Sequence, residues 1–473
     1  MKDNLKGDEV KLLKGKYLSK YFESSKDLLQ ALNSISPSFC LAKWFNVSLH
    51  LPTGKTHSCY HPPAHYIPLD ELNASPDALH NTKHKQEQRK TMLEGKRPKE
   101  CEFCWAIEDQ GNISDRAYRS QDVYEPGLIE EAIKEVKSPK PRYVEVNFNQ
   151  ACNLKCAYCS PHLSTEWHKE VKQHGAYKLI NGNHNDPVWV DNLGIDNSPT
   201  SPYVQAFWEW FPTVYPTLKT FRMTGGEPLM DKNTFKVFDY VKENPNKQLQ
   251  LSITSNCCPP KGQWQKFIAD LKEITDLDAI DHFMLFCSLD SWGKQAEYIR
   301  HGLDFDQLYK NVTHYLKHSS KHSVTFIITA NLLSLPNWVE YIKNIHTLRC
   351  EYNTDRQLIW FDTPMLHDPK WMSMKLANKE MLQSLLDSIV FMEQNIETSN
   401  NRFKGFKDYE IDKVRRLYEW ASVPLNTKDD VLARKNFDLF FKQHDIRRST
   451  DIRKTFPQLE LFIEECRILN EQR

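Results

Sequence analysis

Three cysteines lie close together at positions 152, 156 and 159, in the octapeptide Cys-Asn-Leu-Lys-Cys-Ala-Tyr-Cys. Their spacing is C-x3-C-x2-C, directly after the strand-like run 143–148. Three soft thiolates on one short loop indicate a metal site, and iron–sulfur clusters are held by cysteine thiolates. A cubane cluster has four irons, so three local ligands leave one iron without a protein ligand. We therefore expect Cys152, Cys156 and Cys159 to hold a [4Fe-4S] cluster with an open iron.

Other uses of these cysteines fit the sequence less well. A zinc knuckle needs a fourth Cys or His nearby, and the nearest candidates, His162 and His168, are not at a typical spacing. Disulfides belong to oxidising compartments. The chain begins Met-Lys-Asp-Asn-Leu-Lys without an apolar signal segment, so we expect a reducing compartment.

A second set of four cysteines precedes the octapeptide. Cys40 and Cys59 flank a predicted hairpin, with strand-like alternation from residue 39 to 50 and a turn at 52–55. Cys101 and Cys104 form a C-x2-C pair, which can bind one metal. The four together could hold an iron–sulfur cluster or a structural zinc ion, and the spacing alone does not choose between them.

The middle of the chain alternates short apolar runs with helical patterns. This βα rhythm predicts an α/β fold with a parallel sheet curled into a partial, six-stranded barrel. The predicted strands are 143–148, 218–224, 249–256, 283–290, 324–331 and 358–362.

Alternation within these strands predicts one apolar and one polar face. A closed barrel fills its interior with apolar side chains, so a polar inner face indicates a lumen that holds water or a polar ligand. Glu145 and Arg222 fall on this face, either as a buried ion pair or as substrate contacts. Cys287 has the opposite parity and is interpreted as a core residue.

The second predicted strand ends in Gly225-Gly226-Glu227-Pro228. Strand C-terminal ends are where such folds place their chemistry, and paired glycines let a backbone approach a ligand closely. A protein that only carries electrons does not need a backbone segment that approaches a ligand in this way. This argues for an enzyme.

The cysteine octapeptide and Gly-Gly-Glu-Pro together resemble the motifs of radical S-adenosylmethionine (radical SAM) enzymes, with aromatic Tyr158 just before the third cysteine. The resemblance implies that Gly225, Gly226, Glu227 and Pro228 contact the methionine moiety and that Tyr158 lies against adenine. It also implies further cofactor contacts at Ser255, Asn256, Ser288, Asp290, Arg300 and Asn331.

The spacing C-x13-G-x4-C closed by C-x2-C resembles the auxiliary-cluster module called twitch, a shortened SPASM module. It implies one auxiliary [4Fe-4S] cluster on Cys40, Cys59, Cys101 and Cys104. Here the module precedes the barrel, whereas twitch modules generally follow it. Over nearly its full length, the chain resembles bacterial and phage twitch-domain radical SAM proteins.

The pattern predicts four regions: an amphipathic leader at 1–35, the twitch-like module at 36–135, the barrel at 136–370 and a helical region at 371–473. The insertion 160–216 is too long for a simple βα loop and is a candidate substrate lid. Its aromatic run, with Phe207 and Trp208, is also typical of a helix packed on the barrel, the interpretation we favour; a role for His168 stays open.

The 473 residues carry 62 basic and 62 acidic side chains and 18 histidines, so formal net charge is zero. Nothing here favours nucleic acid as a partner. No run of roughly 18 apolar residues could span a bilayer, so we expect a cytoplasmic protein without membrane contact.

These observations predict an enzyme that reductively cleaves S-adenosylmethionine to a 5′-deoxyadenosyl radical, which abstracts hydrogen from an unidentified polar substrate. The cofactor would perform the difficult step, and the auxiliary cluster would transfer electrons. The expected partners are an electron donor such as flavodoxin or ferredoxin and a small-molecule or peptide substrate. The alternatives are a peptide-modifying maturase and, in another class, a non-catalytic iron–sulfur or zinc protein.

Overall fold

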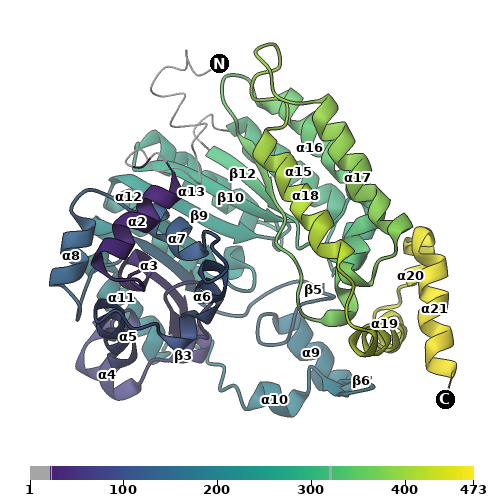
Figure 1. Cartoon of the computed structure of the whole chain (residues 1–473), viewed down its shortest axis with the longest axis horizontal. Helices are drawn as coiled ribbons and strands as arrows, with labels where there is room; N and C mark the ends of the chain where they lie inside the picture. Colours follow the sequence, from purple (N-terminus) through teal and green to yellow (C-terminus); the bar gives the residue numbers. More distant parts are fainter. Residues whose placement is uncertain (1–21, 23, 319–321, 473) are drawn as a thin grey trace. The chain divides into compact units, whose positions relative to one another are not determined.

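The computed structural model describes residue 22 and residues 24–318 and 322–472 of the chain (Figure 1). The chain divides into two compact units. Unit 1 comprises Met1–Phe148, Asp196–Met223 and Gln248–Leu251, and unit 2 comprises Asn149–Ile195, Thr224–Lys247 and Ser252–Arg473. The boundaries predicted at residues 35, 135 and 370 stay sequence-based predictions. Of the predicted leader's apolar positions, Leu12, Leu13, Tyr17 and Tyr21 lie outside the described residues.

The strands of unit 1 follow the order β8-β4-β1-β2-β3. They are β1 (Asn46–His50), β2 (Lys55–His57), β3 (His65–Tyr66), β4 (Tyr143–Asn147) and β8 (Thr220–Thr224), the last of which belongs to this unit through Met223. β1 and β2 form the predicted hairpin, with Ser48 opposite His57. β1 also runs parallel to β4, which the sequence did not predict.

Six helices of unit 1 pack around an apolar cluster that includes two of the four N-terminal cysteines, Cys101 and Cys104. They are α2 (Ser25–Ile35), α3 (Leu41–Phe45), α5 (Lys83–Leu93), α6 (Glu102–Glu108), α7 (Asp115–Val123) and α8 (Leu128–Lys134). Unit 1 also holds α4 (Leu69–Ala74) and α11 (Pro202–Val214). The described part of the predicted leader therefore includes a helix, α2, that packs on this cluster.

One predicted strand segment is a helix instead. Residues 41–45, expected to begin the hairpin, form α3, and all five side chains are buried. A strand with one solvated face buries alternate residues, whereas a helical turn enclosed by α5, α7 and α8 can bury every one. The burial of every residue from 41 to 45 thus reflects enclosure by these helices, not strand alternation.

The parallel strands of unit 2 follow the order β13-β12-β10, and β9 contributes residues to both units. Their bounds are β9 (Asn246–Ser255), β10 (Ile280–Ser288), β12 (His322–Ile327) and β13 (Ile359–Asp362). All six strands predicted for the barrel are therefore present, and the fold is mixed α/β. Their closure into a partial barrel stays a prediction.

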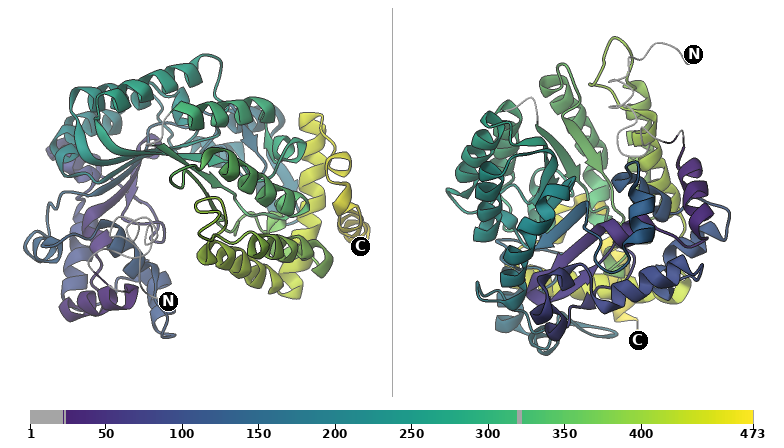
Figure 2. Two further views of the ribbon diagram at one scale, coloured as in Figure 1. Left: turned by 90° about the horizontal axis from the view of Figure 1, so that it is seen from above. Right: turned by 90° about the vertical axis from the view of Figure 1, so that its left-hand side faces the viewer.

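Helices of unit 2 lie along one face of these strands (Figure 2). They include α12 (Lys232–Glu243), α13 (Gln263–Asp276), α14 (Lys294–Ile299), α15 (Phe305–His318) and α16 (Trp338–Tyr352). The side chains of Phe283, Leu285 and Cys287 on β10 are fully buried, which confirms Cys287 as a core residue. Ser288 lies on the opposite parity, as predicted.

The insertion 160–216 divides between the units. Unit 2 holds α9 (Thr165–His174), the hairpin β6 (Tyr177–Leu179) and β7 (Gly182–His184), and α10 (Pro187–Asp191). In unit 1, Phe207 on α11 is fully buried and packs edge-on against Phe148, with ring centroids 4.9 Å apart. The packing interpretation of this aromatic run is therefore confirmed for Phe207.

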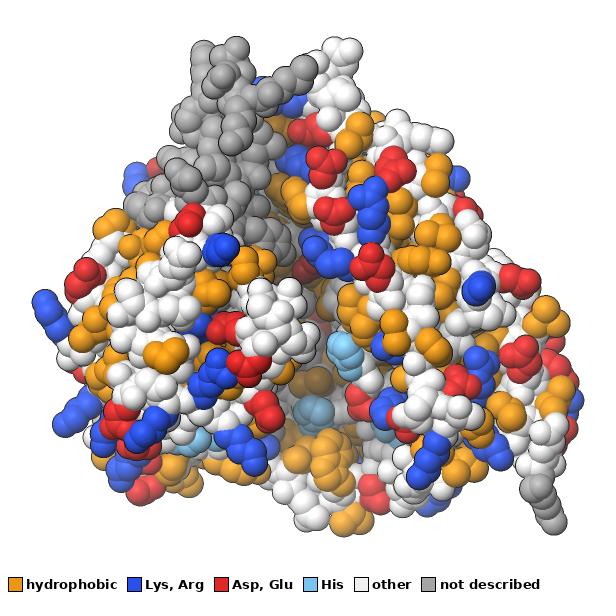
Figure 3. Space-filling view, viewed as in Figure 1, with side chains coloured by type: hydrophobic (Ala, Val, Ile, Leu, Met, Phe, Trp, Pro, Cys, Tyr) orange, Lys and Arg blue, Asp and Glu red, His pale blue; other side chains and the backbone are white. Residues whose placement is uncertain are grey.

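The predicted C-terminal helices are present as α17 (Lys379–Gln394), α18 (Asp408–Ser422) and α19 (Thr427–Arg448), followed by α20 (Ile452–Thr455) and α21 (Glu460–Glu471). Acidic and basic side chains are interspersed over the exposed faces of α17 and α18 (Figure 3). In the ranges that the structure describes, no helix is long and apolar enough to cross a membrane.

Candidate functional site

The cysteine octapeptide forms a short loop in unit 2 around β5 (Lys155–Cys156). The three cysteine side chains are close enough to influence one another electrostatically. Burial, together with the neighbouring Cys156, raises the pKa of Cys159 to about 12, and burial raises the pKa of Cys152 as well. The thiols are therefore protonated at neutral pH unless a metal displaces the protons, as ligand thiols require.

The start of α9 holds this loop at several points. Ser164 Oγ donates to the carbonyl of Leu154 at 2.7 Å, and Thr165 Oγ1 donates to that of Cys152 at 3.1 Å. Trp167 Nε1 donates to the carbonyl of Cys156 at 2.8 Å. The loop that carries the thiols is thus fixed through its backbone, which leaves the sulfur atoms available.

A buried ion network connects the same loop to α19. Glu170 Oε2 lies 2.7 Å from Lys155 Nζ and accepts a hydrogen bond from Arg448 Nε at 3.0 Å. Arg448 Nη1 donates to the Lys155 carbonyl at 2.7 Å. The side chains of Arg448 and Glu170 are 0% and 2% exposed, so the contact belongs to the interior. Burial in this network does not favour a role for Arg448 as a substrate contact.

The Gly-Gly-Glu segment lies directly against the residue before Cys152. A Cβ atom on Gly226 would lie 2.2 Å from the carbonyl oxygen of Ala151, so no larger side chain fits without a shift of the backbone. The amide of Glu227 donates to the same carbonyl at 2.6 Å. Ala151 and Gly226 are 75 positions apart in the chain, so the two motifs meet through the backbones of distant segments.

The Glu227 side chain is buried at the edge of this contact, 1% exposed. Its carboxylate accepts hydrogen bonds from Ser255 Oγ at 2.8 Å, from the Asn256 amide at 2.7 Å and from the Leu229 amide at 3.1 Å. Burial raises the pKa of Glu227 to about 7, although these donors favour the charged form. The carboxylate thus joins the end of β9 to the glycine segment.

Asn256 extends the same network to the cysteine loop. Its Nδ2 donates to Asn153 Oδ1 at 2.9 Å, and Asn153 Nδ2 in turn donates to the Cys258 carbonyl at 2.7 Å. Three predicted cofactor residues, Glu227, Ser255 and Asn256, are therefore brought together beside the octapeptide.

Tyr158, Asp290 and Arg300 form a second polar group next to the loop. The Tyr158 hydroxyl donates to Asp290 Oδ2 at 2.7 Å, and Arg300 Nη2 donates to Asp290 Oδ1 at 3.0 Å. Arg300 Nη1 lies 3.6 Å from the sulfur of Cys156. These three predicted cofactor residues are thus also brought together.

The remaining predicted contacts have local structural partners. Asn331 is fully buried, and its side chain caps the turn at residues 332–337 by accepting from the Leu333 amide at 3.0 Å. Pro228 is buried in the turn after Glu227, and Ser288 ends β10. The assignment of Ser288, Pro228 and Asn331 to a cofactor stays a prediction.

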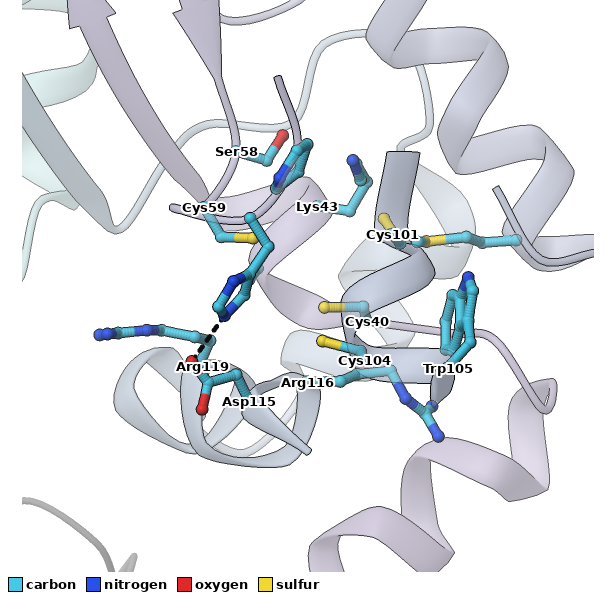
Figure 4. A pocket seen from close by; sticks show the side chains of 14 residues that line it. Cys40, Lys43, Ser58, Cys59, Cys101, Cys104, Trp105, Asp115, Arg116 and Arg119 are labelled. Atoms are coloured by element: carbon cyan, nitrogen blue, oxygen red, sulfur yellow. Dashed lines mark hydrogen bonds and ion pairs between the residues drawn. The ribbon is translucent and has the colours of Figure 1, made fainter. Parts of the chain in front are cut away.

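The four cysteines of unit 1 line one cavity (Figure 4). Cys59 points toward Cys40 and Cys104 from the opposite wall, and Cys101 completes the set. Burial raises the pKa of Cys59, Cys101 and Cys104 to about 12 each, with further contributions from the neighbouring cysteines. The four cysteines that sequence spacing grouped thus line one cavity, and their role as metal ligands stays a prediction.

Basic side chains line the same cavity. Lys43 is 3% exposed and pairs with Glu100, which also contacts His84 at 2.7 Å. Burial opposes the charged form of Lys43, but Cys101 and Glu100 raise its pKa above the ordinary value. Arg116, paired with Glu108 at 2.7 Å, is also part of the lining. Both cations already have carboxylate partners, so they would offset only part of the negative charge of a metal centre bound by thiolates.

Both cysteine sets fit iron–sulfur clusters by their donor chemistry. They supply three and four thiols, the ligand type that these clusters use. Within the described ranges, no three His, Cys, Asp or Glu side chains form a group that could hold a single metal ion. One zinc ion draws all its ligands to one centre, whereas each ligand of a cubane binds a different iron. For the four cysteines of unit 1, the choice between an iron–sulfur cluster and a zinc ion stays a prediction.

A scan against protein-family models finds no match, and a search of curated proteins finds none either. Among solved structures, the chain is similar to native anSMEcpe with bound AdoMet, at 17% identity and a TM-score of 0.31, over 53% of this chain and 61% of that one. The chain thus spans less than two thirds of that protein's length.

The chain is also similar to Streptococcus suis SuiB bound to S-adenosylmethionine, at 14% identity and a TM-score of 0.31, over 74% of this chain and 69% of that one. At such values, the functional conclusion depends on the residues of the site itself.

Glu145 and Arg222 are neighbours on the polar face of the strands in unit 1, as predicted. Arg222 Nε lies 3.6 Å from Glu145 Oε2, which also accepts hydrogen bonds from Tyr60 at 2.9 Å and Tyr143 at 3.0 Å. The parallel register sets Ser48 opposite Glu145, so the polar face continues onto β1. The ion-pair interpretation accounts for this contact without a ligand.

Sequence reasoning missed the residues that support the loop. Trp167, Glu170 and Asn153 are neither cysteines nor part of a recognised motif, and their roles arise from contacts across distant segments. One usable signal was present, because Glu170 follows Trp167 by three residues and therefore shares its face of α9. The orphaned Nδ1 of His168 is buried without a hydrogen-bond partner among the described residues, and its role stays open.

Proposed function

We propose that this chain is a radical SAM enzyme that acts on an unidentified polar substrate. The observation that carries the proposal is the contact between the cysteine octapeptide and the Gly-Gly-Glu segment, through Gly226 and Ala151. Three thiols of the octapeptide would leave one iron of a cubane cluster without a protein ligand, and the adjacent glycine segment would offer its backbone to a ligand bound there.

Cys152, Cys156 and Cys159 would hold a [4Fe-4S] cluster, and Gly225–Glu227 would bind S-adenosylmethionine beside it. When bound, these groups supply the electron and the sulfonium from which methionine and a 5′-deoxyadenosyl radical arise, and the radical takes hydrogen from the substrate. The protein's own part is to hold the loop rigid, through Trp167, and to exclude water by burial. An electron donor of the flavodoxin or ferredoxin type would reduce the site.

The test is anaerobic incubation of the reconstituted full-length protein with dithionite and S-adenosylmethionine. We expect 5′-deoxyadenosine and methionine from wild type and none from Cys156→Ala, because two thiolates do not retain a reactive cubane. The matched control is Cys350→Ala, since Cys350 is exposed and belongs to neither set. Absence of 5′-deoxyadenosine from wild type with an intact cluster would favour the alternative of a non-catalytic electron carrier.

We further propose that Cys40, Cys59, Cys101 and Cys104 hold an auxiliary [4Fe-4S] cluster that transfers electrons. The support is that four thiols surround one cavity with buried cationic side chains in its wall. Four protein ligands saturate a cubane, which leaves it no open position for a substrate. Metal analysis of anaerobically purified protein should give about eight irons per chain; about four irons and one zinc would make this site structural. Among substrate classes, a peptide stays the alternative to a small polar molecule.

A further inference from the structure

The strand pair β5 and β11 (Arg300–His301) sets an arginine beside one of the three cluster cysteines. The antiparallel register puts Arg300 opposite Cys156. From there, Nη1 of Arg300 donates to the Cys156 sulfur at 3.6 Å, and both residues are buried, at 6% and 8% exposed. The pairing of β5 with β11 therefore determines that the guanidinium contacts Cys156 among the three cysteines.

Asp290 fixes the direction of the guanidinium. It is 1% exposed, and its Oδ2 lies 2.9 Å from Arg300 Nε while its Oδ1 accepts from Nη2 at 3.0 Å. The Thr329 amide donates to Oδ1 at 2.9 Å, and the Tyr158 hydroxyl donates to Oδ2 at 2.7 Å. With Asp290 held by two other segments, Nη1 is the group that faces the sulfur.

The charge of this arrangement does not change with pH over the working range, because a guanidinium keeps its proton. A hydrogen bond from a cation to a cluster sulfur stabilises added negative charge, and such bonds help to set reduction potentials. An electron added to a cluster on Cys156 would therefore be stabilised by Arg300.

We propose that Arg300 is a positioning residue that raises the reduction potential of the cluster bound by Cys156, and that Asp290 aims it and moderates its effect. The inference rests on the proposed function. It gives Arg300 a different role from the cofactor contact that the sequence resemblance implied. The electron donor could then reduce this cluster at a less negative potential.

The test is a redox titration followed by electron paramagnetic resonance, on the full-length reconstituted protein without S-adenosylmethionine. A Cys101→Ala background leaves one cluster to titrate. We expect Arg300→Met to lower the equilibrium constant for reduction about tenfold, the effect of one charge-assisted hydrogen bond, or about 59 mV for one electron. Arg300→Lys keeps the charge but loses the planar fork, so the decrease should be smaller.

Asp290→Asn should shift the equilibrium in the opposite direction, because it removes a negative charge next to Arg300. Opposite signs for Arg300→Met and Asp290→Asn would support the proposal, since a merely structural contact would not produce them. Unchanged potentials, or shifts of the same sign, would overturn it. If Arg300→Met does not retain iron, the signs of the potential shifts of Arg300→Lys and Asp290→Asn are compared instead. Absence of any cluster in wild type would instead refute the proposed function.

Discussion

Replacing Glu170 with Gln removes the carboxylate that Arg448 and Lys155 share, while keeping the size of the side chain. These cations lower the pKa of Glu170 from 4.5 to about 2, against the effect of burial. A shift of that size corresponds to roughly 3 kcal/mol of stability at neutral pH. Lys155, whose side chain is 19% exposed, is partly screened by solvent, so we expect a loss of about 2 kcal/mol.

The sign of the pH dependence follows from the lowered pKa. The stabilisation is fully present above the unfolded value of 4.5 and is lost as pH falls toward 2. The gap in urea midpoint between wild type and Glu170→Gln should therefore be constant from pH 7 to about 5.5 and should narrow below pH 4.5.

Glu166→Gln is the matched control, because Glu166 lies on the same helix and makes an exposed ion pair with Lys169 at 2.6 Å. Such pairs contribute about 0.5 kcal/mol or less. Urea unfolding followed by tryptophan fluorescence compares the two variants, and iron retention after reconstitution reports on the loop. An equal effect of both substitutions, or a gap that widens at low pH, would refute the reasoning.

Three further predictions concern the two cysteine sites. Gly226→Ala should lower both iron retention and S-adenosylmethionine binding, because its Cβ would displace Ala151 next to Cys152; unchanged values by iron assay and calorimetry would contradict this. Glu227→Gln should gain stability relative to wild type as pH rises from 5 to 8, since burial raises the wild-type pKa to about 7 and ionisation then costs stability; a pH-independent difference in melting temperature would contradict this. Cys101→Ala should reduce iron from about eight to about four atoms per chain while 5′-deoxyadenosine still forms, and an unchanged iron content would contradict the auxiliary cluster.

Sequence patterns predicted the helices and strands better than the contacts that each of them makes. The strands of unit 2 and the C-terminal helices were predictable because apolar periodicity directly reflects which side faces a core. The segment 41–45 was wrongly predicted as a strand because it is enclosed on all sides, which removes the periodic signal. The parallel pairing of β1 with β4 is a contact between distant segments, which local patterns do not encode.

At the candidate site, too, the sequence predicted which residues group together but not all of their contacts. Spacing was sufficient to group Cys40, Cys59, Cys101 and Cys104, since few chemistries require four cysteines together. Gly226 was expected to allow close approach of a ligand, and the structure shows close approach to the backbone of Ala151. The role of Arg448 could not be predicted, because the sequence does not distinguish a buried arginine from a solvated one. Only tertiary contacts distinguish them.

The hydrogen bond from Arg448 to the Lys155 carbonyl joins residues 293 positions apart in the chain. During synthesis, the cysteine loop emerges long before this arginine exists. At about 5–20 residues per second, the interval is roughly 15–60 s. Throughout that time the loop that carries the three thiols lacks its hydrogen bond from Arg448. The order of translation therefore favours delivery of iron and sulfide after the C-terminal helices have folded, and leaves the three thiols open to oxidation until then.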